Sequence, residues 1–166
     1  MSLNEMLTSE LQYEAATTRK MLERVPQDAF DWKPHEKSMS LGQLAAHVAN
    51  LHDTWLVTTL TSEDFDLADS TPLNARTVPE ILEAFDRSIS RAVELLKAQT
   101  EESLHATWRL KRGGQLLFEL PRWVVLRSMV VNHIIHHRGQ LSVYLRLRNV
   151  PLPAMYGPSA DEAPAF

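Results

Sequence analysis

The sequence predicts an all-α fold, a four-helix bundle with long connections. Three observations predict it: four long segments carry apolar residues at helical spacing, none contains proline beyond its first turn, and the 166 residues include five glycines. Each segment is apolar along one stripe, so it must bury that stripe against the others around a common core. Residues 1–166 are therefore expected to form one domain, with an extended, proline-rich tail over 149–166.

The first helix is expected over residues 3–24. Ser2 and Glu5 form a capping box, in which each side chain accepts a hydrogen bond from a free amide of the first turn. Pro26 ends the helix, because the residue before a proline disfavours helical backbone, and residues 26–39 form a connection. The apolar stripe steps by three or four through Leu3, Leu7, Leu11, Ala15, Thr18 and Leu22.

The second helix is expected over residues 41–60, after a capping box of Ser40 and Gln43. Its apolar face holds Leu44, His47, Val48, Leu51 and Trp55. Residues 61–76 are rich in acids, and we expect a solvated loop because acidic connections need no protein partner. Those acids are Glu63, Asp64, Asp66 and Asp69.

The third helix is expected over residues 78–98. Thr77 and Glu80 make a third capping box, and Pro79 falls in the first turn, where proline is tolerated. Residues 103–120 then break the helical rhythm. They form either a short hairpin that turns at Gly113-Gly114 or an irregular crossover.

The fourth helix is expected over residues 122–148, with Pro121 at its start. Its core-facing stripe steps by three or four and includes two histidines. The stripe consists of Leu126, Val130, His133, His137, Leu141 and Tyr144.

Zero cysteine beside seven histidines limits the chemistry. Without cysteine the chain has no disulfide, thiolate zinc site, iron–sulfur cluster or cysteine nucleophile. The N-terminus lacks the basic region of a signal peptide, and no apolar run approaches a membrane span, so we expect a cytoplasmic protein without a membrane partner. A net charge of −4 argues against a dedicated nucleic-acid partner.

Three histidines on two helices point toward one interior: His47 on the second helix and His133 and His137 on the fourth. His133 and His137 are four residues apart and so lie on one side of a helix. Because an unpaired buried polar group costs about 1–3 kcal/mol, one shared divalent cation would satisfy all three rings. The alternative is three core histidines that hydrogen-bond to Tyr, Gln and backbone groups.

The other four histidines are weaker candidates for metal ligands. His136 competes with His137, since it also neighbours His133 on a helix, and only the apolar stripe favours His137. His52 lies about 140° round the helix from His47 and should face elsewhere. His35 and His105 fall in connections, where we expect them to face solvent.

The element His133-x-x-x-His137-Arg138-Gly139-Gln140-Leu141, the upstream Ala46-His47 and the ending Val150-Pro151 with Met155-Tyr156-Gly157-Pro158-Ser159 resemble the DinB/YfiT-like family. The resemblance implies a four-helix bundle, often a homodimer, that binds a divalent metal, nickel or zinc. Its ligands match His47, His133 and His137, which decides against His136. Arg138 would anchor an acid on a neighbouring helix, and Gly139 would allow close helix approach.

The resemblance also implies a candidate activity: metal-dependent transfer of a low-molecular-weight thiol, such as bacillithiol or mycothiol, to an electrophile. Two alternatives stay open, a metal-dependent hydrolase and a non-catalytic metal-binding stress or interaction bundle. No residue is assigned as catalytic. The candidates by proximity are Tyr144, Gln140, Asp53 and His52.

Two surface groups complete the expectations. Trp123, Val125 and Ile135 lie off the core stripe and would cover either a second copy or the bundle's own loops. Basic residues gather around the hairpin and the start of the fourth helix, where they form a solvated edge or line a pocket for an anionic thiol. These are Arg109, Lys111, Arg112, Arg122 and Arg127.

Overall fold

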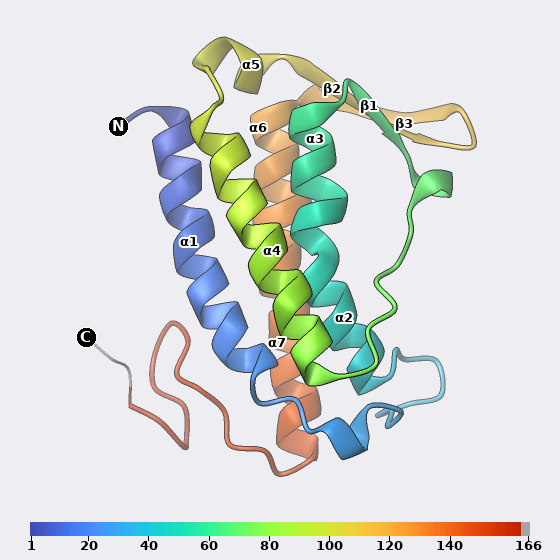
Figure 1. Ribbon diagram of the computed structural model, residues 1–166, viewed down its shortest axis with the longest axis vertical. Helices are drawn as coiled ribbons and strands as arrows, with labels where there is room; N and C mark the ends of the chain where they lie inside the picture. The colour runs from blue at the N-terminus through green and yellow to red at the C-terminus, as the bar shows by residue number, and fades with distance from the viewer. Residues whose placement is uncertain (164–166) are drawn as a thin grey trace.

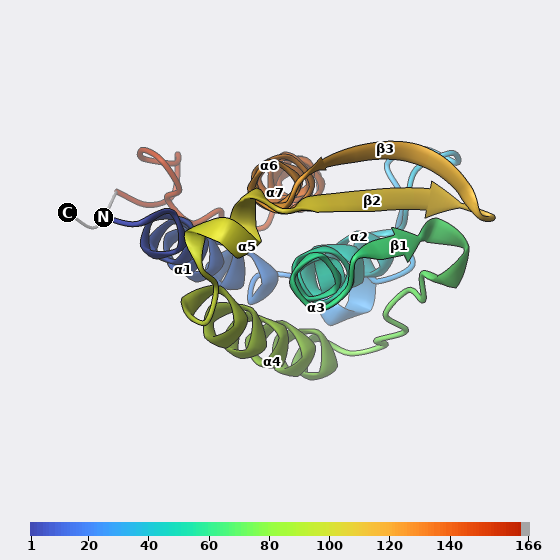
Figure 2. The same ribbon diagram turned by 90° about the horizontal axis from the view of Figure 1, so that it is seen from above.

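Four long helical rods stand side by side, and a small sheet projects from one end of them (Figures 1 and 2). This computed structural model describes residues 1–163. The rods are α1 (Leu3–Leu22); α2 (Leu41–Leu51) with η2 (His52–Val57) and α3 (Thr58–Thr61); α4 (Val78–Lys97); and α6 (Arg122–Val125) with η4 (Leu126–Val131) and α7 (Asn132–Leu147). The short elements are η1 (Gln27–Ala29), η3 (Leu67–Asp69), α5 (Glu101–His105), β1 (Asp64–Asp66), β2 (Thr107–Arg112) and β3 (Gln115–Pro121).

The predicted capping residues start three of the rods. Ser40 and Gln43 exchange hydrogen bonds at the start of α2, and Thr77 and Glu80 do the same at α4. At α1 the Glu5 carboxylate accepts from the Ser2 amide. Each exchange satisfies amides that have no partner inside the helix, so these boundaries follow from local chemistry.

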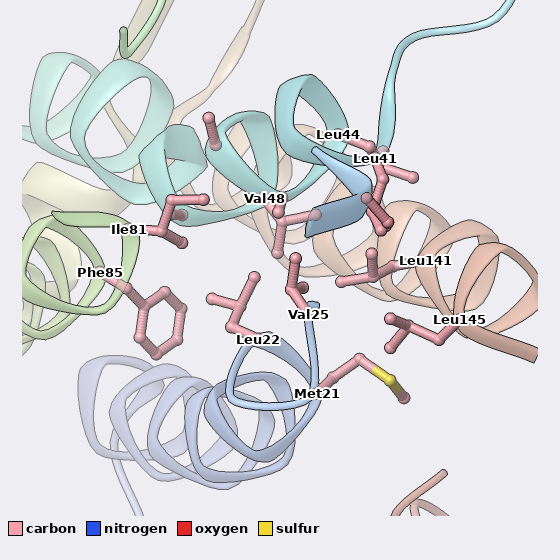
Figure 3. Close-up of a cluster of buried hydrophobic side chains, with 14 of the residues drawn as sticks. Met21, Leu22, Val25, Leu41, Leu44, Val48, Ile81, Phe85, Leu141 and Leu145 are labelled. Atoms are coloured by element: carbon pink, nitrogen blue, oxygen red, sulfur yellow. The ribbon is translucent and has the colours of Figure 1, made fainter. Parts of the chain in front are cut away.

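The predicted stripes meet in a core that all four rods share. Figure 3 shows Leu22 of α1, Val48 of α2, Phe85 of α4 and Leu141 of α7 pointing into one interior. A second buried cluster, centred on Leu11, Leu51 and Leu96, continues the core toward the end that carries the sheet. Together these clusters fix how α2 and α7 face each other.

Two rods contain π-helical segments that the sequence stripes do not predict. The rod that begins with α2 has one over His52–Val57, and the rod that ends with α7 has one over Leu126–Val131. The two segments contact each other in the bundle. Single π turns inside α-helices occur frequently at functional sites.

The all-α prediction is wrong in one respect, because the chain also forms a three-stranded mixed sheet. β2 and β3 pair antiparallel, which confirms the hairpin. Gly113 and Gly114 make its turn at φ of 57° and 78°, a backbone region that favours glycine. β1 lies parallel on the other side of β2.

β1 also corrects the expectation that residues 61–76 are a solvated loop. Two of its acids have partners in the hairpin: Asp64 pairs with Lys111, and Asp66 accepts from the amides of Gly113 and Gly114. The backbone amides lower the pKa of Asp66, beginning with that of Ala68. The acidic connection is therefore bound to the hairpin turn.

Val125 is fully buried, which removes it from the expected surface for a second copy. It packs beneath the hairpin with Trp108 and Leu110, in a third apolar cluster. Val125 therefore covers the chain's own hairpin and not a second copy of the protein.

Most of the basic residues near the hairpin are paired within the chain. Arg109 meets Glu119 at 3.3 Å, and Arg127 meets Glu10 at 3.2 Å. Arg122 donates to the carbonyl oxygens of Thr59 and Ser62. This edge is held by ion pairs and carbonyl groups.

Residues 150–163 contain neither helix nor strand, as predicted for the tail, and 164–166 lie outside the described residues. Arg24 pairs with Glu162 and Arg146 with Asp161, so the tail is tied to α1 and α7. Among the described residues, no helix combines the length and apolarity that crossing a bilayer requires.

Candidate metal centre

Three predicted histidines converge between α2 and α7. His47 lies in the middle of α2, while His133 and His137 occupy successive turns at the start of α7. Their candidate ligand nitrogens all lie within 4.8 Å of one another, and the ring centroids are 4.5 to 5.4 Å apart. The three side chains are close enough to share one divalent cation.

Burial keeps these imidazoles neutral at pH 7. It lowers the pKa of His47 to about 4, with a further contribution from the charges of His137 and His133. Burial also lowers the pKa of His133 and of His137. A neutral imidazole offers a lone pair, whereas a protonated one cannot bind a metal, so the cluster is in its ligating form.

Two hydrogen bonds select the nitrogen that each ring of α7 offers. The Nδ1 of His137 lies 2.6 Å from Oε1 of Gln140, and the Nδ1 of His133 lies 3.3 Å from the carbonyl oxygen of Met129. Both partners are acceptors, so each Nδ1 carries the proton and Nε2 keeps the lone pair. Metal-binding histidines are oriented by partners of this kind.

The remaining histidines stay outside the cluster. His136 is exposed, and His35 and His105 are exposed as predicted. His52 does face elsewhere, but it faces protein: its buried ring lies edge-on to Phe85 of α4 at 5.7 Å. Neither of its ring nitrogens has a hydrogen-bond partner among the described residues, and burial lowers its pKa to about 3.

The candidates for proton transfer do not gather at the cluster. Asp53 faces Arg91 of α4 at 3.6 Å, on the same side as His52. Tyr144 packs edge-on to Trp32 and donates to the carbonyl oxygen of Met39 at 3.4 Å. Gln140 contacts the cluster, as the hydrogen-bond acceptor that orients His137.

A cleft of about 460 Å³ opens beside the cluster, and His47 and His133 are among the residues that line it. Sequence reasoning missed this cleft because one wall comes from the irregular connection that follows η3. Helical spacing could have identified the polar residues of α2 and η2 that line the cleft, because they lie on the same face as His47. They are Gln43, four residues before His47, and Asn50 and Thr54, three and seven residues after it. The other lining residues are Met39, Gln43, Asn50, Leu51, Thr54, Trp55, Ser70, Thr71, Pro72 and Leu73.

Trp55 is held beside the histidines by two edge-on contacts. Its ring centroid lies 6.3 Å from that of His133 and 6.2 Å from that of Phe65 on β1. One turn earlier, the Asn50 amide donates to the Thr54 hydroxyl at 2.9 Å. The cleft therefore presents a fixed aromatic ring and a hydrogen-bonded polar pair next to the candidate metal ligands.

Arg138, directly after His137, points the other way, into the interface with α1. Its guanidinium lies 2.7 Å from Glu14, as the prediction of an acid on a neighbouring helix requires, and it also contacts Thr18. The Tyr156 hydroxyl of the tail accepts from Arg138 and donates to Glu14. The charged ends of Arg138 and Glu14 are thus buried but paired.

Gly139 does not have the predicted role in close helix approach. Within residues 1–163, a Cβ placed there would meet no heavy atom within 4 Å outside its chain neighbours and the nearby backbone of its own helix, so no other described helix approaches this position. Gly42 is the close-contact glycine instead, because a Cβ there would lie 2.8 Å from the Phe30 ring.

Comparisons with known proteins agree with this architecture. A family model described as the DinB family matches residues 1–164. The Bacillus subtilis (strain 168) protein YrdA, itself uncharacterized, is 26% identical over 160 residues, which cover 93% of this chain and 89% of that one.

Two solved structures share the fold. A DinB-like protein from Bacillus cereus ATCC 10987 has a TM-score of 0.72 and 22% identity, over 92% of this chain and 97% of that one. The DinB-like protein YjoA from Bacillus subtilis has a TM-score of 0.71 and 21% identity, over 90% and 97%.

Proposed function

The chain belongs to the DinB family, and we propose that it is a divalent-metal-dependent enzyme that transfers a low-molecular-weight thiol to an electrophilic substrate. The observation that carries the proposal is the cluster of three neutral imidazoles beside an open cleft, which His47 and His133 line. Three protein ligands leave coordination positions free, which is typical of catalytic metal sites rather than structural ones. Imidazole ligands suit both nickel and zinc.

The residues fit such an ion on three counts. Their nitrogens converge, their pKa values keep them neutral, and Gln140 and the Met129 carbonyl hold two of the rings by Nδ1.

In the proposed reaction a sulfur–carbon bond forms between the thiol and the electrophile, and the bond from that carbon to its leaving group breaks. The leaving group, a halide for example, departs with the electron pair, and the thiol proton passes to water. A divalent ion held by the cluster would supply Lewis acidity that lowers the thiol pKa. The sulfur must come from outside, since the chain has no cysteine.

The chain's own part is to hold and shield the reactants. Leu51 and Trp55 give the cleft apolar wall surface next to His47 and His133, and a substrate that packs against this surface would displace water from the site. The volume of the cleft suits a small molecule of ordinary size.

One observation favours the non-catalytic alternative. Asp53 and His52, two candidates for proton transfer, face α4 instead of the cleft. An ion in the cluster would then only join α2 to α7. A hydrolase would use the same site with water in place of the thiol.

The test combines metal content with thiol consumption. Purified protein is loaded with zinc or nickel and mixed with monochlorobimane and, in turn, bacillithiol, mycothiol and glutathione. We expect metal-dependent formation of the fluorescent thioether with at least one thiol, and its loss in His137→Ala. His136→Ala is the matched control, because His136 is exposed and is not one of the three converging ligands, although its ring lies 4.9 Å from that of His137.

The negative outcomes separate the alternatives. Metal retention without thioether formation from any thiol would favour the non-catalytic bundle. Metal-dependent cleavage of an ester without added thiol would favour the hydrolase. Unchanged metal retention in His47→Ala, His133→Ala and His137→Ala would refute the metal site itself.

A further inference from the structure

The cleft beside the histidine cluster is lined by neutral side chains. Among residues 1–163, none of its lining side chains belongs to Lys, Arg, Asp or Glu. Its polar groups, apart from the two histidines, are amides and hydroxyls, such as those of Gln43, Asn50 and Thr71. The lining thus offers hydrogen bonds but no fixed charge.

From this lining we infer that the electrophilic substrate is an uncharged aromatic compound that packs against Trp55 and hydrogen-bonds to the Asn50–Thr54 pair. This inference rests on the proposed function only where it calls the ligand an electrophile. What the cleft selects, a flat neutral ring with a polar substituent, follows from its own side chains.

Trp55 supplies the aromatic surface. Phe65 and His133 both meet its ring edge-on, which fixes the ring in place, and its half-buried side chain lines the cleft. A ligand ring that packs on a preorganised indole gains aromatic contact without the entropy loss of ordering the side chain.

The Asn50–Thr54 pair supplies the polar contact. The hydrogen bond between them satisfies one donor of the Asn50 amide and leaves the amide oxygen and the Thr54 hydroxyl proton for a ligand. Both residues lie on the same face of the rod as His47, so a ligand on Trp55 is within their reach.

Anionic ligands are disfavoured by the same lining. A carboxylate that enters the cleft must lose hydration, which is costly without a cationic partner. The basic residues near the hairpin do not line this cleft, contrary to the idea that they form a pocket for an anionic thiol.

The test uses two isosteric ligands, 4-chloro-3-nitrobenzamide and 4-chloro-3-nitrobenzoate, which share a ring and a leaving group but differ in charge. Binding to the full chain, zinc-loaded and metal-free, is measured by equilibrium dialysis without thiol, so that no reaction occurs. We expect the benzamide to bind at least about 10-fold tighter than the benzoate. Equal or tighter binding of the benzoate would overturn the inference.

A charge variant tests the cause. Thr71→Lys adds a cation at an exposed position of the cleft wall. It should lower the ratio of benzamide affinity to benzoate affinity by about 10-fold. Gln115→Lys, which adds the same charge on the hairpin outside the cleft, should leave the preference unchanged. An equal change in both variants would show a long-range charge effect and contradict the assignment.

Two substitutions test the aromatic contact. Trp55→Leu should weaken benzamide binding about 3–10-fold, while Trp55→Phe should retain most of it. Circular dichroism and zinc content confirm that each variant is folded and keeps the metal site. If Trp55→Leu binds the benzamide like the wild type, Trp55 is not the platform.

These measurements can refute the ligand class and the proposed function independently of each other. Selective benzamide binding without any thiol transfer would refute the transferase but leave the ligand class standing. Thiol transfer to bimane without preference between benzamide and benzoate would refute only the ligand class.

Discussion

His137 and Arg138 are neighbours in sequence, yet the polar groups on the two sides of α7 are satisfied in opposite ways. Toward α1, the Arg138 guanidinium meets Glu14, Thr18 and Tyr156, so the buried charge is paired within the chain. Toward α2, the histidine rings leave nitrogen lone pairs beside an open cleft. A closed network stabilises the fold, whereas an open cluster is available to a ligand.

His52 sharpens the comparison as a third case. It lies on the same rod as His47 and its pKa is also lowered by burial, yet within residues 1–163 neither of its ring nitrogens has a hydrogen-bond partner. A lowered pKa therefore does not by itself mark a functional histidine. Convergence with other ligands at a cleft does.

The largest effect is expected from breaking the closed side. Arg138→Leu leaves Glu14 buried without its cation, and such losses lower the free energy of unfolding by about 3–5 kcal/mol. Urea denaturation measures the change, with Arg146→Leu, which breaks a more exposed pair with Asp161, as a control of little effect. A fully stable Arg138→Leu protein would show that the network is dispensable.

Opening the other side should affect the metal rather than the fold. His137→Ala should weaken zinc binding on the order of 100-fold or more, since about 10–16 kcal/mol is shared by the few ligands of a zinc site. The metal-free variant should unfold within about 1 kcal/mol of wild type. Metal analysis after dialysis measures the zinc affinity, and urea denaturation measures the free energy of unfolding. Unchanged zinc binding together with a large loss of stability would show that His137 serves the fold and not the metal.

A smaller effect on the metal is expected from Gln140. Gln140→Leu removes the acceptor that holds the His137 proton on Nδ1, so zinc affinity should fall about 10–100-fold. Ser142→Ala, which removes a hydroxyl bonded to the Gly139 carbonyl, is the matched control on the same helix. Zinc titration that shows equal affinities in both variants would leave Gln140 without an orienting role.

The burial of His52 predicts that the metal-free protein loses folding stability as the pH falls. Its folded pKa of about 3 lies below the ordinary 6.5, so the unfolded chain takes up the proton first as pH falls, and stability decreases below pH 6.5. Between pH 7 and 5 this contributes a loss of about 2 kcal/mol. His52→Leu should remove that part of the loss in urea denaturation, and an unchanged pH slope would contradict it.

The smallest expected effect is on the pH dependence of metal binding. Three ordinary imidazoles with a pKa of 6.5 would lose about 30-fold in zinc affinity between pH 7 and 6. Because burial lowers all three pKa values here, the loss should be smaller than 30-fold. Equilibrium dialysis with zinc at both values checks this, and a 30-fold loss would mean that the rings are hydrated.

What the sequence predicted well depends on local rules. Capping pairs such as Ser40 and Gln43 act within one turn, and helical spacing alone brings His133 and His137 to one side. The pairing of Arg138 with an acid was expected from its place in the family element and from the chemistry of arginine, and Glu14 confirms it. The family resemblance then favoured His137 over His136, in agreement with the geometry.

What the sequence missed depends on pairing across long distances. β1 is three residues long, and its register places Asp64 opposite Arg109 of β2, which is far away in sequence. No local pattern therefore marks this strand. The same connection supplies Leu73 to the cleft, which exists only once the chain has folded. Val125 lies off the helical stripe and is buried because the hairpin covers it.

The π segments have a consequence for how sequences of this fold should be aligned. A π turn holds about one residue more than an α turn, which amounts to a rotation of about 100° for everything beyond it. Deletion of a single residue within Leu126–Val131 would keep the rod but turn His133 and His137 relative to α6. One-residue gaps among relatives are therefore to be sought inside these helices as well as in the loops.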